Sequence, residues 1–176
     1  MKFLRVLLFA SFVIGAVSIS PKPLSGVSVV VSSNAFIERS PIPAAYTCDG
    51  PGRSPELEWT WIPDNARSIV IVVDDFTTFD LDKTVHWIVW NIDPRTRELH
   101  AGSNGGGVEG LNDFESRGYR GPCPPRGETH VYGFRLFGLD NVLSLDPSTT
   151  TKVELERAMD MHVVAGGTLI GAYTRP

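Results

Sequence analysis

The chain has 176 residues, of which 42% are hydrophobic and 20% are charged, and its formal net charge is −4. This length suits one well-buried domain and is too short for two domains of ordinary size. The excess of acidic residues disfavours nonspecific binding to nucleic acid or to anionic membrane surfaces, because both would repel the protein.

Residues 1–18 have the features of an export signal. Lys2 and Arg5 supply positive charge, residues 6–17 are uncharged and almost wholly apolar, and small residues near Ser18 offer a cleavage site. The apolar stretch is shorter than the roughly 20 residues that a membrane-spanning helix needs. We therefore expect a cleaved signal peptide and no membrane span in the mature protein.

The remaining chain divides into two parts. We expect residues 19–32 to form an N-terminal extension or an edge strand, and residues 33–176 to form a single domain. Export would place this domain in the periplasm or outside the cell. Cys48 and Cys123 could then be joined, since a disulfide persists in such compartments, but two separate buried thiols are equally consistent with the sequence.

Apolar residues recur mostly with a period of two, which predicts strands. The run "LEWTWIP" places Leu57, Trp59 and Trp61 on one face, and the segment that ends the chain has a glycine break. The predicted strands cover residues 57–63, 67–75, 85–92, 130–140 and 163–174. Several strands with one or two helices indicate a mainly β domain whose sheets are largely antiparallel.

One helix is predicted over residues 151–161. Thr151 is a candidate N-cap and Glu154 follows three residues later, which is the capping-box pattern. Val153, Leu155, Ala158 and Met159 make its apolar face.

The stretch of residues 101–129 shows no period and holds eight of the 17 glycines. Connections of this length inside a compact domain are usually either functional or disordered. Its second half, "RGYRGPCPPRG", alternates glycine and proline, and such residues hold a backbone in an unusual path. The rigid prolines favour a functional loop.

Four polar residues sit where predicted strands begin or end. Asp75 closes one strand, His86 opens the next, and His130 and Tyr132 lie two apart on a third, so their side chains share a face. Asp75 is the expected partner of His86, because a short loop joins their strands. Imidazole N–H, phenolic O–H and loop N–H groups are all donors, so the group suits a small anion. Each residue taken alone also has a purely structural explanation.

Six fragments together resemble the phosphatidylethanolamine-binding proteins, and specifically their bacterial Raf-kinase-inhibitor-like branch. They are "IPAAYTCDG", "SPELEW", "VHWIVWNI", "GLNDF", "GYRGPCPPRGETHVYGF" and "AMDMHVVAGGTLIGAY", and the match as a whole runs from about residue 33 to residue 173. The resemblance implies a β-sandwich of antiparallel sheets, one large and one small, with a few peripheral helices and an anion-binding cavity at one end. The residues that it places in the cavity are Asp75, His86, Pro124, Pro125, His130 and Tyr132.

One motif departs from the family pattern. The usual Asp-Pro-Asp-x-Pro is replaced by "DFTTF", in which Phe76 and Thr77 stand for the first proline and the second aspartate, and Phe79 for the last proline. We expect a less rigid loop and a less acidic rim. A shift in register could also place Asp74 in the cavity instead of Asp75.

These features predict a non-enzymatic binding protein for a phosphate, phosphoethanolamine or carboxylate group, without cofactor or metal. A protein target such as a protease or a kinase is implied by the resemblance. Alternatives are a secreted protease inhibitor with no small ligand, a hydrolase, and a zinc protein built on His86, His130 and Asp75. No nucleophile motif such as Gly-x-Ser-x-Gly and no local metal motif supports the last two.

Overall fold

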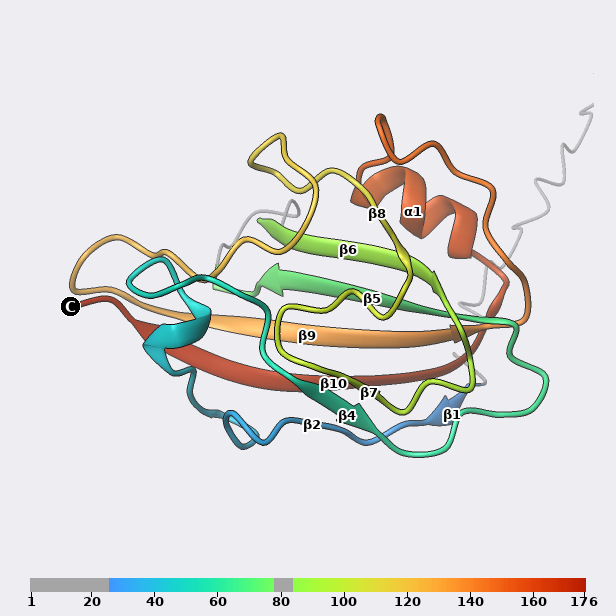
Figure 1. Cartoon of the computed structure of the whole chain (residues 1–176), viewed down its shortest axis with the longest axis horizontal. Coiled ribbons are helices and arrows are strands. Elements are labelled where there is room, and N and C mark those ends of the chain that lie inside the picture. The colour runs from blue at the N-terminus through green and yellow to red at the C-terminus, as the bar shows by residue number, and fades with distance from the viewer. Residues whose placement is uncertain (1–25, 78–83) are drawn as a thin grey trace, which may run out of the picture.

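The computed structural model describes residues 26–77 and 84–176, which form two packed sheets (Figure 1). The signal peptide predicted over residues 1–18 lies outside the described residues. The larger sheet contains, in spatial order, β1 (Val27–Ser28), β10 (Val163–Thr174), β9 (Thr129–Leu139), β5 (Ser68–Asp75), β6 (Val85–Ile92) and β8 (Val108–Glu109). Its seventh strand, β3 (Ser40–Pro41), also pairs with β10, and the smaller sheet contains β2 (Val31–Ser32), β4 (Leu57–Trp59) and β7 (Glu98–Leu99).

The predicted mainly β fold, with one large and one small sheet, is confirmed. The long strands β5, β6, β9 and β10 pair antiparallel, whereas the short β1 and β3 run parallel to β10. Every residue of β5 is buried, because this strand lies between β6 and β9 and both of its faces are covered. A continuous apolar run is the sequence pattern that such a strand requires.

The two faces of the larger sheet contact different partners. One face packs on the smaller sheet, and Ile71 and Phe134 there share a cluster with Leu57 and Trp59. The opposite face packs on α1 (Lys152–Met159) and on the segment that precedes this helix. The domain core is therefore split into two clusters by the central strands.

Helix α1 begins with the predicted capping box. The N–H of Thr151 donates to Oε2 of Glu154 at 3.0 Å. Leu155 and Met159 are buried against the sheet, but Val153 is half exposed and does not belong to the buried face. A second, short helical turn, the 3₁₀ helix η1 (Ala44–Tyr46), lies beside the C-terminus in Figure 1.

Two strand predictions need correction. The first concerns β4, which ends at Trp59, so that Trp61 is 53% exposed and does not continue the buried face. The second concerns β10, which runs through Gly166 and Gly167 without a break. Gly167 is needed there because a Cβ would lie 2.0 Å from the carbonyl oxygen of Val29.

The segment expected to form an edge strand is divided between both sheets. Val27–Ser28 forms the edge strand β1 of the larger sheet, and Val31–Ser32 forms β2 of the smaller one. Within residues 26–77 and 84–176, no helix is long and apolar enough to cross a membrane.

Candidate functional site

The candidate site lies where β5 ends and β9 begins, near the C-terminus at the left of Figure 1. Asp75 is paired in register with Tyr132, and His130 lies two residues before Tyr132 on the same face of β9. Side chains alternate along a strand, so the pairing brings the three residues to one side of the sheet. The structure thus assembles three of the six predicted site residues on two neighbouring strands.

Asp74 points to the opposite face of the sheet. Its fully buried carboxylate contacts the guanidinium of Arg135 and lies 3.3 Å from Nζ of Lys152. Two cations therefore compensate this buried charge on the side that carries α1. Of the two aspartates considered from the sequence, Asp75 is the one beside His130.

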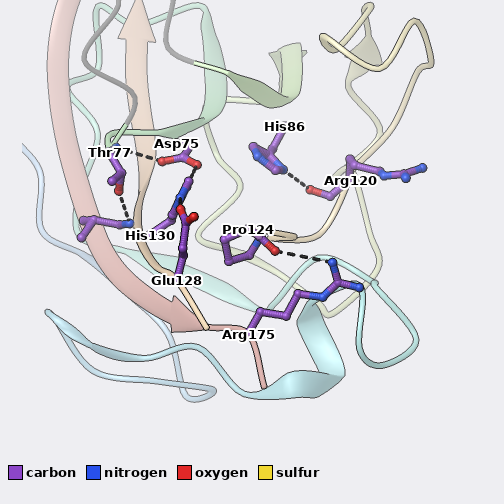
Figure 2. Close-up of polar contacts among 9 residues, drawn as sticks. Asp75, Thr77, His86, Arg120, Pro124, Glu128, His130 and Arg175 are labelled. Atoms are coloured by element: carbon purple, nitrogen blue, oxygen red, sulfur yellow. Dashed lines mark hydrogen bonds and ion pairs between the residues drawn. The ribbon is translucent and has the colours of Figure 1, made fainter. Parts of the chain in front are cut away.

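Asp75 and His130 form a close pair (Figure 2). Oδ2 of Asp75 lies 2.5 Å from Nδ1 of His130, and Oε2 of Glu128 lies 3.3 Å from Nε2 on the other side of the ring. Burial alone would lower the pKa of His130, but hydrogen bonds to the two carboxylates, together with their charges, outweigh it and raise this pKa above its ordinary value. The two acids therefore favour the charged form of the His130 ring, which lies between them.

The end of β5 is fixed by Phe76 and Thr77, which stand where the motif Asp-Pro-Asp-x-Pro has its first proline and second aspartate. The N–H of Thr77 donates to Oδ1 of Asp75 at 2.8 Å, and its Oγ1 accepts from the N–H of Val131 at 2.7 Å. The N–H of Phe76 donates to the carbonyl of Val131 at 2.7 Å, and its ring covers Gly133. These contacts hold the backbone at the start of the loop, where a proline would otherwise restrict it. Phe79 lies outside the described residues.

His86 has a different partner from the one predicted. Its Nδ1 lies 2.7 Å from the carbonyl oxygen of Arg120, whose own N–H donates to the His86 carbonyl at 2.9 Å. Asp75, the expected partner, pairs with His130. A bulge turns His86 toward this side of the sheet. Val73 pairs with Trp87 and the next residue of β5 pairs with Val85, so that His86 is the extra residue, and its ring lies beside that of Tyr132.

The partner of His86 defines its tautomer. A carbonyl oxygen only accepts, so Nδ1 carries the proton. Burial lowers the pKa of His86, and neither the Arg120 carbonyl nor the negative charge of Asp75 restores it. His86 is thus a neutral imidazole, and its Nε2 is an acceptor.

Tyr132 lies between the two histidines. The centroid of its ring is 5.2 Å from that of His86 and 6.5 Å from that of His130. Burial raises its pKa, as do the charge of Asp75 and a hydrogen bond to it, whereas a hydrogen bond with the Cys123 backbone opposes this change. The hydroxyl is therefore engaged inside the protein, where it helps to orient Asp75.

The proline-rich loop borders the site through Pro124. Pro124 is buried and its carbonyl oxygen lies 3.5 Å from Nη1 of Arg175, whereas Pro125 is exposed. Arg175 also lies 3.4 Å from Asp49, and Asp49 accepts a 2.6 Å hydrogen bond from the Tyr173 hydroxyl. The C-terminal segment thus holds the loop from outside.

A disulfide joins this loop to η1. Cys48 and Cys123 are bonded, and their Cα atoms lie 5.4 Å apart. The N–H of Cys48 also donates to the carbonyl of Pro122 at 3.0 Å. Gly121 permits this close approach, since a Cβ there would lie 2.7 Å from the carbonyl oxygen of Tyr46. The glycines and prolines of this loop therefore allow it to pack closely against Tyr46 and Cys48.

An aromatic residue lies against the His86 side of the site. Phe114 is 40% exposed, and its ring meets the His86 ring edge-on at 5.3 Å. The guanidinium carbon of Arg120 lies 5.0 Å from the centroid of the Phe114 ring, which is a cation–π geometry. A ligand near His86 would meet this apolar and cationic rim.

Several contributors to the site were missed from the sequence. Glu128 could have been found, because it precedes His130 by two residues and therefore shares its face. Thr77 follows an aspartate by two, which is a turn signal. Arg120 acts through its backbone and Arg175 comes from a distant strand end, so neither leaves a local pattern.

The remaining two histidines pair with acids outside the site. His162 pairs with Asp140 at 2.7 Å on the surface, and His100 lies 3.8 Å from Glu98. Among the described residues, no three His, Cys, Asp or Glu side chains are grouped so that they could hold a metal ion.

Two packed sheets with a histidine held between carboxylates at the end of the central strands define a β-sandwich whose polar cluster could hold a ligand. The family model for phosphatidylethanolamine-binding protein matches residues 32–174. The chain belongs to this family. Two UPF0098 relatives are each 42% identical to it. The one from Pyrococcus horikoshii aligns over 85% of this chain and 76% of its own, and the one from Methanothermobacter thermautotrophicus over 82% and 98%.

Solved structures agree with this assignment. A phosphatidylethanolamine-binding protein homologue from Chlamydia trachomatis superposes with a TM-score of 0.78 at 37% identity, over 85% of this chain and 99% of that one. YbcL of Escherichia coli has a TM-score of 0.77 at 24% identity, over 84% and 99%, and is similar in fold.

Proposed function

We propose that this protein binds a small anion, namely a phosphate, a phosphate monoester such as phosphoethanolamine, or a carboxylate, without transforming it. The observation that carries the proposal is the 2.5 Å contact between Asp75 and His130 at the end of the central strands, which orients the His130 ring and favours its charged form. A preoriented cation with an N–H donor is what a desolvated anion requires.

His86 favours one form of the anion. Its neutral ring offers an acceptor at Nε2, whereas the charged ring of His130 offers a donor. A phosphate that retains one proton can satisfy both, because it accepts from His130 and donates to His86. We therefore expect phosphate to bind more tightly than sulfate, which carries no proton at neutral pH.

The test is a calorimetric titration of the protein with inorganic phosphate and phosphoethanolamine. We expect binding, and we expect His130→Gln to weaken it by about tenfold, the value of a hydrogen bond to a charged group. His162→Gln is the matched control, because His162 also pairs with an aspartate but lies away from the site. Absence of binding, or equal loss in both variants, would contradict the proposal.

The absence of catalysis belongs to the same proposal. Both cysteines are joined in a disulfide, so neither offers a thiolate nucleophile. Turnover in a phosphatase and esterase screen, abolished by His130→Gln, would make the protein a hydrolase. Near-stoichiometric zinc in protein purified without an affinity tag would favour a metal site.

Export and a protein target are the remaining parts of the proposal. The disulfide supports an oxidising compartment, the periplasm or the exterior, since such bonds are rare in reducing cytosol. A protease or kinase target is the alternative that a failed anion titration would favour, and a pull-down from the envelope fraction would test it.

A further inference from the structure

Glu128 occupies the nitrogen of His130 that a ligand would need. Nδ1 of His130 faces Asp75, so Nε2 is the position left for an incoming anion, and Oε2 of Glu128 lies 3.3 Å from it. The side chain of Glu128 is 59% exposed, whereas that of His130 is 14% exposed. The outer contact is thus made by a carboxylate that lies mostly in solvent.

The backbone of Glu128 is fixed although its side chain is exposed. Its N–H donates to the carbonyl of Pro125 at 3.1 Å, and its carbonyl accepts from the N–H of Arg175 at 3.2 Å. Movement of the carboxylate away from His130 therefore needs only side-chain rotation, without a change in β9 or in the proline-rich loop.

The charges around His130 make that movement necessary. The groups that face its ring are the carboxylates of Asp75 and Glu128 and the aromatic ring of Tyr132. An anion bound while both carboxylates remain in place would give three negative groups around one positive ring. Such a like-charge arrangement is unfavourable, so the outer carboxylate has to leave.

We propose that Glu128 is an internal competitor of the ligand. Its carboxylate occupies the position beside Nε2 of His130 until an anion displaces it. This inference rests on the proposed anion-binding function. The competing group is tethered, so its effective concentration at His130 is high. Any anion that uses Nε2 has to displace the same carboxylate. Glu128 therefore lowers the apparent affinity for phosphate and for acetate by the same factor.

The experiment compares the affinities of phosphate and acetate for the wild-type protein, Glu128→Gln and Glu128→Ala. Titrations at about pH 6 and low salt favour the protonated form of His130 in every variant, because Asp75 remains beside the ring. We expect phosphate to bind about three- to tenfold more tightly to both variants. This range corresponds to the loss of a half-exposed ion pair with His130 and of one negative charge beside the ligand. Acetate should gain by a similar factor, because the same carboxylate is released from Nε2 for either ligand.

The matched control is Glu98→Gln. It removes the same charge from an exposed glutamate that also lies beside a histidine, 3.8 Å from His100. The anion affinities of this variant should equal those of the wild-type protein. The ¹⁵N shift of Nε2 in His130, followed by NMR without ligand, should change in Glu128→Gln and stay constant in Glu98→Gln.

The outcomes separate the two proposals. If the wild-type protein binds phosphate and both Glu128 variants bind it equally or more weakly, the competitor role is overturned and the anion-binding function stands. If only the Glu128 variants bind, the competitor role is supported and the unmodified protein is not a phosphate binder. If none of the proteins binds either anion, both proposals fail.

Discussion

The two histidines of the site show how partners define chemistry at the scale of a residue. His130 faces carboxylates, which favour the charged ring, and its pKa is raised. His86 faces a carbonyl oxygen in a more buried position, and its pKa is lowered. One site therefore contains a cationic donor and a neutral ring whose free nitrogen accepts, although the residue type is the same.

The raised pKa of His130 predicts a pH-dependent stability. The charged ring contributes fully below the ordinary pKa of about 6.5, and this contribution is lost as pH rises through the higher pKa of the folded state. We expect the wild-type protein to have a higher free energy of unfolding than His130→Gln. This difference should be largest in mild acid and should become smaller at alkaline pH.

Urea unfolding over a series of pH values measures this difference. His162→Gln serves again as the control for loss of a surface histidine. A difference between wild type and His130→Gln that stays constant with pH would show that the His130 pKa is not raised.

At the scale of the element, the end of β5 depends on a ring packed over a glycine. A Cβ added to Gly133 of β9 would lie 2.1 Å from Cζ of Phe76. The ring therefore lies directly against the β9 backbone, beside the two backbone hydrogen bonds that Phe76 and Thr77 make with Val131. This packing fixes the residues that orient Asp75.

Replacement of Gly133 tests that packing. Gly133→Ala should lower the free energy of unfolding by about 1–3 kcal/mol, because the ring has to move. Gly166→Ala on the neighbouring strand is the matched control, since its Cβ would meet nothing closer than 3.7 Å. Chemical denaturation measures both, and equal effects would show that the Phe76 ring is readily displaced.

The elements themselves were largely predictable from the sequence. The strands 85–92 and 163–174 and the capping box of α1 follow local patterns, which the structure reproduces. The direction of His86 was not predictable, because a bulge depends on how two strands pair and not on either sequence alone. The exposure of Trp61 was not predictable either, since β4 ends at Trp59, opposite the first residue of its partner strand β2.

At the scale of the whole molecule, the site depends on segments far apart in the chain. The disulfide between Cys48 and Cys123 closes a separation of 75 residues and holds η1 against the loop that carries Pro124. Arg175 adds a contact from the end of β10. The sequence allowed this bridge without deciding it, because the distance between the two cysteines is a property of the fold.

Loss of the disulfide should therefore affect stability and binding together. In the chain-entropy model, a loop of this length contributes about 4 kcal/mol, so the double variant Cys48→Ser/Cys123→Ser should unfold at much lower denaturant. Phosphate affinity should also fall, because Pro124 follows Cys123 directly. Wild-type protein under reducing conditions should match the variant, and unchanged unfolding in both would contradict the prediction.

The contacts of Arg175 also have a consequence for folding. Its backbone pairs with Gly127 and Glu128, and its side chain reaches Pro124 and Asp49, so the loop beside His130 is closed by a residue that follows every site residue in the chain. A nascent chain that lacks β10 has the two histidines but not the arrangement that holds them ready. The site therefore takes its final arrangement only when β10 docks, and not when the histidines themselves are made.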